Sequence, residues 1–267
     1  MPRRPNTMRR LLAGLMALAV IPLAIACGET KGAEPSPAAI ATAESASRVV
    51  SITGPSGKTP EAGGADDDVM LSGRVFGSGP TGVILVHTRL ADQTAWFPFA
   101  TQLAATGNYT VLTFDFRGFG DSSGDKDFDV VDVDLMSAYD YMRGVLNKRT
   151  VFLVGASTGG TAALVVGTRV AVAGVVSISS PGELPPLDAE AAVRRLDVAK
   201  LFIVSKDDVP QAHDQATMVA EAPEPKDAAV YDGNAHGTDL LQGPHAAEVE
   251  QRVMDFLSQY ATASSGR

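Results

Sequence analysis

Residues 151–167 read VFLVGASTGGTAALVVG. The run begins with four apolar residues, as in a strand that is covered on both faces of a parallel sheet. It ends in a segment of helical length, Thr158–Gly167, and between the two stands the pattern G-x-S-x-G, from Gly155 to Gly159. This succession of strand, pattern and helix predicts a sharp turn that lifts the hydroxyl of Ser157 above the edge of the sheet.

Both glycines of the pattern have a physical reason. A serine on so tight a turn leaves no room for a Cβ atom two residues before or after it, which suits Gly155 and Gly159. The helix that begins at Thr158 also points backbone N–H groups toward developing negative charge. We interpret Ser157 as a nucleophile; a glycine-rich turn with an incidental serine is the alternative.

A serine hydroxyl needs a base to take its proton, and the chain has four histidines. His236 lies in a turn directly after the last predicted strand, where loops converge on the serine. His87 ends another strand near the same edge and is its main rival. His213 and His245 lie in or beside predicted helices. The chain order of nucleophile, acid and histidine favours His236.

The histidine needs a carboxylate that fixes its tautomer and stabilises the imidazolium. Asp207 and Asp208 follow the predicted strand Lys200–Val204 and precede His236 in the chain. We choose Asp208, and Asp207 is the alternative. One of the two acids also suits the N-terminus of a helix, where the helix dipole favours negative charge.

Short apolar runs alternate with helical segments over the body of the chain. Such alternation predicts an α/β fold with a mostly parallel, doubly wound sheet, whose ligands bind beyond the carboxyl ends of the strands. A first strand is expected within Arg48–Thr53, and further strands over Val69–Phe76, Gly82–His87, Thr110–Asp115, Thr150–Val154, Ala171–Ser177, Lys200–Val204 and Ala228–Tyr231. Helices are expected over Trp96–Thr106, Val130–Val145, Thr158–Gly167, Gln211–Glu221 and Ala246–Tyr260.

With these features the chain resembles the α/β-hydrolase family over most of residues 69–260. Besides the serine turn, residues 115–122 read DFRGFGDS and are similar to the family's D-x-R-G-x-G-x-S segment. Residues 205–208 read SKDD and are similar to its G-x-x-D acid turn, with Ser205 in place of glycine, and this match selects Asp208. The resemblance implies an α/β-hydrolase fold and an enzyme that cleaves carboxylic esters or related acyl compounds.

The loop that begins VHTR at Val86 matches the H-G-x loop of the family, with Thr88 in place of the glycine. By that match, the backbone N–H groups of Arg89 and Thr158 are the two donors to the oxyanion. The same match makes His87 a structural residue.

Relatives with a lid insert a helical domain after the strand that corresponds to Ala171–Ser177. Only residues 181–198 separate that strand from the next one here, so we expect no large lid domain and an open site. A thioesterase, peptidase or acyltransferase with the same triad is an alternative, because these reactions use the same groups. A binding or scaffold lipoprotein that keeps the hydrolase fold without catalysis is another.

The composition is that of a globular domain: 45% of the 267 residues are hydrophobic and 20% are charged. The single cysteine excludes an internal disulfide, and the histidines show no zinc spacing, so we expect neither metal nor cofactor. Acidic residues number 31 against 22 Lys and Arg, and four of those arginines lie among the first ten residues. An acidic body of this kind disfavours binding to nucleic acid.

The N-terminus has the features of a secretory signal. Four arginines precede an apolar stretch from Leu11 to Ala26, which at about 16 residues is shorter than a spanning helix requires. The residues before Cys27 resemble a bacterial lipobox, with Ala24 where Leu or Val is usual, and this resemblance implies lipidation of Cys27. An uncleaved single-span anchor is the alternative.

We therefore expect three parts in the chain. Residues 1–26 would form a lipoprotein signal peptide, and residues 27–47 a flexible tether that starts at the lipidated Cys27. The tether is expected because this stretch is rich in Ala, Ser, Thr, Pro and Glu without an apolar period. Residues 48–262 would form the hydrolase domain, a monomer held outside the cytoplasm on the cell membrane and acting on a small acyl substrate.

Overall fold

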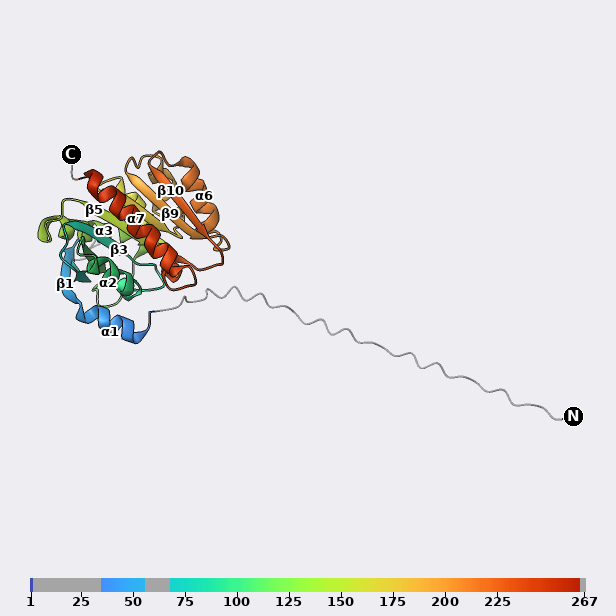
Figure 1. The fold of residues 1–267 in the computed structure, drawn as a ribbon, viewed down its shortest axis with the longest axis horizontal. Helices are drawn as coiled ribbons and strands as arrows, with labels where there is room; N and C mark the ends of the chain where they lie inside the picture. Colours follow the sequence, from blue (N-terminus) through green and yellow to red (C-terminus); the bar gives the residue numbers. More distant parts are fainter. Residues whose placement is uncertain (2–34, 56–67, 265–267) are drawn as a thin grey trace, which may run out of the picture. The chain divides into compact units, whose positions relative to one another are not determined.

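The computed structural model describes Met1, residues 35–55 and residues 68–264. Apart from Met1, the expected signal peptide lies outside the described residues, and so does Cys27. All helices and strands described below belong to the compact unit Lys31–Arg267 (Figure 1).

Eight strands form one sheet in the order β1-β2-β4-β3-β5-β6-β9-β10. β1 pairs antiparallel with β2, and β2 with β4, whereas every other neighbouring pair is parallel. The predicted mostly parallel α/β sheet is therefore confirmed. The strands are β1 (Ser47–Gly54), β2 (Val69–Phe76), β3 (Thr81–Val86), β4 (Tyr109–Phe114), β5 (Val151–Ala156), β6 (Gly174–Ile178), β9 (Ala199–Ser205) and β10 (Lys226–Tyr231).

Burial along the strands explains their sequence patterns. Every residue of β3, β4, β5, β6 and β9 is buried, as expected for continuous apolar runs that helices cover on both faces. The edge strand β1 instead alternates, with Val50, Ile52 and Gly54 buried and their neighbours exposed. β10 forms the other edge and is not fully buried at any residue.

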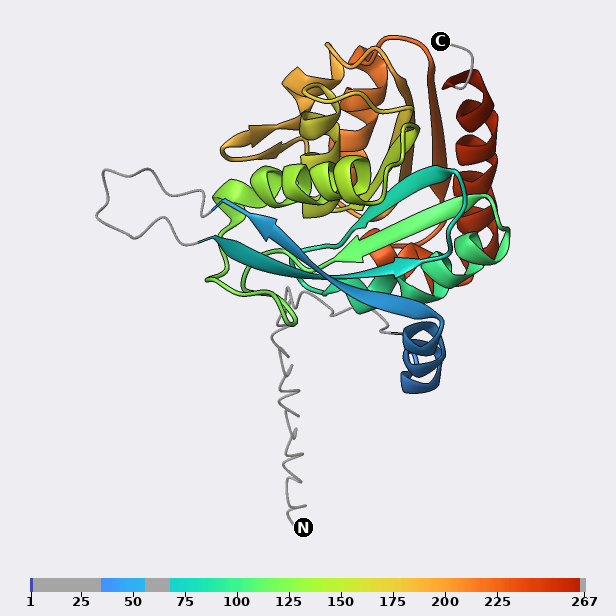
Figure 2. The same cartoon turned by 90° about the vertical axis from the view of Figure 1, so that its left-hand side faces the viewer.

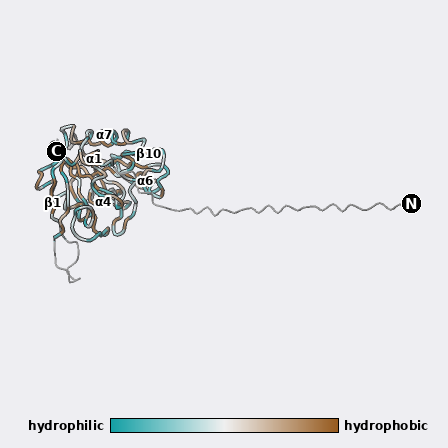
Figure 3. The backbone as a smooth tube through the Cα atoms, turned by 90° about the horizontal axis from the view of Figure 1, so that it is seen from below, coloured by the Kyte–Doolittle hydropathy of each residue, from teal (hydrophilic) through white to brown (hydrophobic). Residues whose placement is uncertain are grey.

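Helices cover the two faces of the sheet and enclose two apolar cores. One core contains side chains of α3 (Val131–Asp140), α4 (Thr158–Gly167), α5 (Ala189–Val193) and α6 (Gln211–Glu221). The other contains side chains of α1 (Pro37–Ser45), α2 (Phe97–Ala105) and α7 (Ala246–Ser264). Figure 2 shows these helices on either side of the strands, and hydrophobic backbone segments run through the interior in Figure 3.

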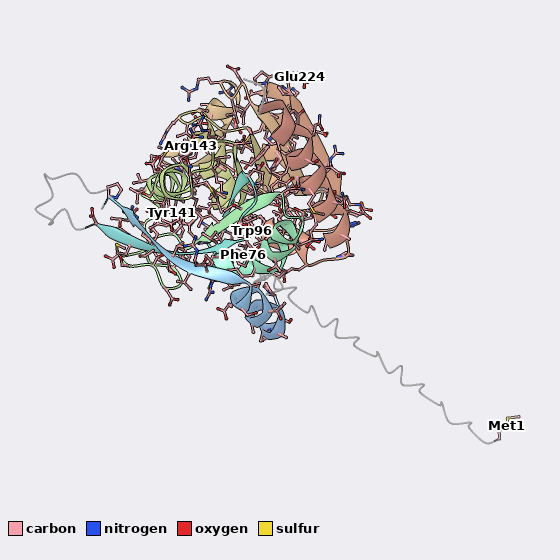
Figure 4. The ribbon with its side chains drawn as sticks, turned by 60° about the vertical axis from the view of Figure 1, so that its left-hand side comes forward. Met1, Phe76, Trp96, Tyr141, Arg143 and Glu224 are labelled. Atoms are coloured by element: carbon pink, nitrogen blue, oxygen red, sulfur yellow. The ribbon has the colours of Figure 1, made fainter. Side chains whose placement is uncertain are left out.

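The largest buried side chains of the second core come from the segments around β2 and α2. Phe76 and Trp96 are both fully buried. Figure 4 shows the two labelled residues near each other in the lower part of the domain. The ring of Phe97 packs on Phe76 with a centroid distance of 5.5 Å. Among the residues that the structure describes, no helix combines the length and the apolar content needed to cross a bilayer.

The expected flexible tether does not extend to Ser47, because its last part is the helix α1. Ser36 caps this helix by accepting a hydrogen bond from the Ala39 N–H (3.2 Å), and Pro37 occupies its first turn. Ala43 of this helix is buried in the second core. The next residue, Glu44, forms an ion pair with Arg74 of β2 (3.1 Å). The prediction failed because a nine-residue helix with one buried alanine has almost no apolar period.

Only short elements lie between β6 and β9, within residues 179–198, all of which are described. They are the two-residue strands β7 (Glu183–Leu184) and β8 (Leu187–Asp188), which pair antiparallel, and the helix α5. A large lid domain is absent from this segment, as predicted. The short helices η2 (Gln93–Trp96), η3 (Phe128–Val130), η4 (Tyr141–Val145) and η5 (Gly237–Leu241) complete the described fold.

A buried ion pair joins the loop after β4 to α3. The guanidinium of Arg117 donates to Asp134 Oδ1 from Nε (2.9 Å) and Nη2 (2.6 Å), and the Arg117 N–H donates to Asp134 Oδ2 (2.9 Å). Both side chains are almost fully buried. Such a pair is costly to break, because the remaining charge stays in a low dielectric.

We expect Arg117→Met to lower the free energy of unfolding by about 3–5 kcal/mol, because the Asp134 carboxylate then stays buried without its cation. Chemical denaturation followed by circular dichroism measures this loss. Arg169→Met is the matched control, since Arg169 pairs with Asp132 while its own side chain is 48% exposed. That change should cost less than about 1 kcal/mol; equal losses in the two variants would contradict the prediction.

Candidate active site

The turn between β5 and α4 holds Ser157 in a strained conformation. Its φ is 50° and its ψ is −121°, which is unusual for a residue with a side chain and costs about 1–3 kcal/mol. The Ser157 N–H donates to the carbonyl of Ile178 in β6 (2.8 Å). The Ser157 carbonyl accepts from Gly160 and Thr161 in the first turn of α4, so the backbone is fixed on both sides of the serine.

Two glycines make this turn possible. A Cβ atom on Gly155 would lie 2.2 Å from the Gly159 carbonyl oxygen, and one on Gly159 would lie 2.4 Å from the Val86 carbonyl oxygen. Neither distance is compatible with a side chain. The first turn of α4 consequently lies directly against the end of β3, where the loop with the predicted oxyanion donor begins.

The structure brings the three predicted side chains together. Ser157 Oγ lies 2.9 Å from His236 Nε2, and both carboxylate oxygens of Asp208 lie 3.0 Å from His236 Nδ1. Ser157 is 6% exposed, the Asp208 side chain 7% and the His236 side chain 30%. The histidine therefore stays reachable from solvent while its two partners are buried.

The hydrogen bonds assign the protons in this arrangement. An ionised carboxylate only accepts, so Nδ1 of His236 carries the hydrogen that it donates to Asp208. Nε2 then has a free lone pair and accepts the hydroxyl hydrogen of Ser157. This is the tautomer that a base needs in order to take the serine proton.

Backbone contacts hold the acid turn on the histidine turn. The Ser205 hydroxyl donates to the Ala235 carbonyl (2.8 Å), and the Asp207 N–H donates to the Gly233 carbonyl (3.0 Å). Ser205 thus links the two turns at the position where the family has glycine. Asp207 is exposed, whereas Asp208 is buried beside His236, so the geometry selects Asp208 between the two candidate acids.

His87 is enclosed in the structure and cannot serve as the base. It is fully buried, its Nδ1–H donates to the Thr88 carbonyl (2.6 Å), and its Nε2 accepts from the Phe116 N–H (2.9 Å). Burial lowers the pKa of His87 to about 4, so the ring stays neutral. Because a trans peptide points C=O and N–H in opposite directions, the bond to Thr88 O also aims the Arg89 N–H away from the His87 ring.

A second support for the same loop was not predicted from the sequence. Asp115 accepts from the Gln93 N–H (2.8 Å) and from Gln93 Nε2 (2.7 Å), and Gln93 Oε1 accepts from the Thr113 hydroxyl (2.8 Å). Burial raises the pKa of Asp115 to about 6, so the carboxylate is ionised at neutral pH and can accept both bonds. The loop between His87 and Gln93 is therefore held at both ends by the segment after β4.

The predicted oxyanion donors lie on the two segments that meet at Gly159. Thr158 is the first residue of α4, so its N–H has no carbonyl one turn earlier in the helix. Arg89 lies in the loop after β3. His213 is exposed on α6, and the ring of His245 lies at a tilted angle to Tyr231 (5.3 Å between centroids); the hydrogen bond to Ser157 Oγ comes from His236. No group of acids, histidines and cysteine among the described residues could hold a metal ion.

Comparison with known proteins gives a family and a fold. Residues 83–262 match the family described as the alpha/beta hydrolase family. Comparison with curated protein sequences gives no significant match. Among solved structures, the esterase Pf2001 of Pyrococcus furiosus superposes with a TM-score of 0.65 at 19% identity, covering 86% of this chain and 97% of that one.

Two further solved structures have a similar fold. A membrane phospholipase A, described as a bacterial virulence factor, gives a TM-score of 0.65 at 16% identity over 83% of this chain and 91% of its own. The esterase domain of a Rhodothermus marinus protein gives a TM-score of 0.63 at 18% identity. The match covers 80% of this chain and 98% of that one. At these identities the likeness concerns the fold.

The buried neutral state of His87 predicts a pH-dependent contribution to stability. The pKa is lower in the fold than in the unfolded chain, so this contribution is complete above pH 6.5 and is lost as the pH falls toward 4. Its full size is about 3 kcal/mol. Urea unfolding of the wild type and of His87→Gln from pH 7 to pH 4.5 should give diverging curves, with the wild type losing more stability. Parallel curves would contradict the assignment.

Proposed function

Because the chain belongs to the alpha/beta hydrolase family, we propose that it is a serine hydrolase that cleaves carboxylic esters through an acyl-enzyme on Ser157. The observation that carries this proposal is the chain of hydrogen bonds from Ser157 Oγ through His236 to Asp208, with lengths of 2.9 and 3.0 Å. Two of the structures with the same fold are esterases, which supports esters as the substrate class.

The first half of the reaction transfers the acyl group to the serine. Ser157 Oγ attacks the ester carbonyl carbon while His236 Nε2 takes its proton, and Asp208 stabilises the imidazolium. The carbonyl oxygen becomes an oxyanion that accepts hydrogen bonds from the Thr158 and Arg89 N–H groups, each worth about 2.7–4 kcal/mol in comparable sites. The carbon–oxygen bond of the ester then breaks, and the alcohol leaves with the proton from His236.

The second half releases the acid. Water attacks the acyl carbonyl as His236 Nε2 takes one of its protons, and the same two N–H groups hold the second oxyanion. The bond to Ser157 Oγ breaks, the carboxylic acid leaves, and the proton returns from His236 to the serine. The strained turn keeps the nucleophile in one place through both halves, because its backbone is hydrogen-bonded on both sides.

The short connection between β6 and β9 supports an accessible site. Residues 179–198 contribute only β7, β8 and α5, and the His236 side chain keeps 30% of its surface exposed. An open site suits small esters or esters that project from a surface. It does not suit a substrate that must be enclosed in a long tunnel.

We also propose that the chain is a lipoprotein anchored outside the cytoplasm through Cys27. The support is in the sequence: a basic start, an apolar stretch from Leu11 to Ala26, and the only cysteine of the chain directly after it. Two or more acyl chains on one residue give stable attachment to a bilayer, whereas a single chain gives only marginal attachment.

We expect a fluorophosphonate probe to label the wild-type chain on Ser157, because the probe reacts only with a serine that a base activates. Intact mass and peptide mass spectrometry identify the modified residue. Ser157→Ala should lose the label and the turnover of p-nitrophenyl butyrate, while Ser258→Ala, at an exposed position on α7, should keep both. A folded wild type that stays unlabelled would contradict the enzyme and favour a scaffold protein.

Lipidation is tested by the position of the chain in the cell. We expect the wild type to fractionate with membranes and Cys27→Ser to be released, because serine cannot form the thioether that carries the lipid. Immunoblots of membrane and soluble fractions measure the distribution. A variant that still fractionates with membranes would contradict the lipid anchor and favour an uncleaved N-terminal span.

A further inference from the structure

Thr88 is the residue at which the loop after β3 departs from the H-G-x pattern. It is 5% exposed and stands between the buried His87 and the exposed Arg89, whose N–H is a proposed oxyanion donor. A glycine at this position would leave the loop more conformational freedom. With threonine here, the loop is instead restricted by the contacts of the Thr88 side chain.

The peptide units on both sides of Arg89 are restrained, and the hydroxyl of Thr88 holds the second of them. Thr88 Oγ1 accepts a hydrogen bond from the Leu90 N–H (3.2 Å), a local turn in which a threonine side chain bonds to the backbone two residues on. The Thr88 carbonyl accepts from the ring of His87 (2.6 Å). The peptide unit before Arg89 is thus fixed through its carbonyl and the unit after it through its N–H.

The methyl group of Thr88 lies beside the turn that carries His236. Gly237 follows His236 directly and has a φ of 57°, and a Cβ atom built on it would lie 3.0 Å from Thr88 Cγ2. The same point lies 3.5 Å from the Cβ of Ala156 and 3.9 Å from the Cβ of Ser157. Gly237 is therefore bounded on one side by Thr88 of the loop after β3 and on the other by Ala156 and Ser157 of the serine turn.

We propose that Thr88 is a positioning residue that sets two parts of the site through its two γ substituents. Its hydroxyl, by holding the Leu90 N–H, fixes the turn through Arg89 and with it the direction in which the Arg89 N–H faces the oxyanion, and its methyl group supports the turn of His236. This inference rests on the proposed function, because it assigns roles in the reaction at Ser157. It also explains how the loop keeps a defined shape with threonine in the place of glycine.

Isosteric variants separate the two roles. Thr88→Val keeps a methyl group and the volume but loses the acceptor for Leu90, so we expect kcat for p-nitrophenyl butyrate to fall about tenfold to hundredfold with KM within twofold. Thr88→Ser restores the acceptor and should recover kcat to at least a third of the wild-type value. Thr88→Gly loses both contacts and should be no more active than Thr88→Val.

Thr110→Val is the matched control. Thr110 is also buried, and its hydroxyl donates to the Gly79 carbonyl (2.7 Å). It lies at the amino end of β4, however, whereas Ser157 follows the carboxyl end of β5. The control should keep kcat. A value for Thr88→Val within twofold of the wild type, or a loss of kcat in Thr110→Val as large as in Thr88→Val, would overturn the role of the hydroxyl.

A double-mutant cycle tests the methyl contact. Gly237→Ala introduces a Cβ atom against Thr88 Cγ2, and its backbone strain at positive φ is the same in every background. The loss of kcat on Gly237→Ala should therefore be at least threefold smaller in Thr88→Ser than in the wild type. Equal losses would overturn the contact.

Labelling of the wild type distinguishes this inference from the function on which it rests. A wild type that reacts with fluorophosphonate on Ser157, together with an unaffected Thr88→Val, would overturn the role of Thr88 alone. A folded wild type without label or turnover would overturn both.

Discussion

The close approach of three strand ends at the serine turn is the constraint on which the rest of the site depends. Missing β-carbons allow it: a Cβ on Gly159 would meet the carbonyls of Val86 and His87, and one on Gly160 would lie 1.8 Å from Ser180 Oγ. The end of β3 consequently lies against Gly159, and the end of β6 is hydrogen-bonded to Ser157 through the Ile178 carbonyl. The strained backbone of Ser157 persists because the hydrogen bonds and the packing on both sides of it hold it in place.

Three consecutive residues after β4 connect the surrounding elements to one another by hydrogen bonds. Asp115 holds the start of η2 through Gln93, the Phe116 N–H holds the ring of His87, and Arg117 holds α3 through Asp134. This short loop thereby fixes both ends of the segment between His87 and Gln93, which carries the proposed oxyanion donor Arg89. The arrangement explains why buried charge is kept here, although burial makes it costly.

The amino-acid sequence predicts the parts of this molecule that depend on local pattern. Continuous apolar runs gave the central strands, with ends displaced by one to three residues, and the helices α4 and α6 have the predicted bounds. The G-x-S-x-G turn selected Ser157, the chain order favoured His236, and the match to the family's acid turn selected Asp208 over Asp207. Contacts between segments far apart in the chain, such as Gln93 with Asp115 or Thr88 with Gly237, leave no periodic signal. Helix α1 escaped prediction for a related reason, since it is held by its contacts with α2 and β2 rather than by a pattern in its own sequence.

The helix α1 also fixes where the polypeptide enters the domain. β1 runs in the same direction as the parallel strands, and α1 precedes it, so the entry point lies at the amino edge of the sheet (Figure 2). Ser157 and His236 follow the carboxyl ends of β5 and β10, at the other edge. In the lipid-anchored hydrolase that we propose, the anchor and the ester would therefore reach the domain at opposite ends of its parallel strands. Under that proposal, the opening at Ser157 and His236 would face away from the membrane, toward substrates in the surrounding medium.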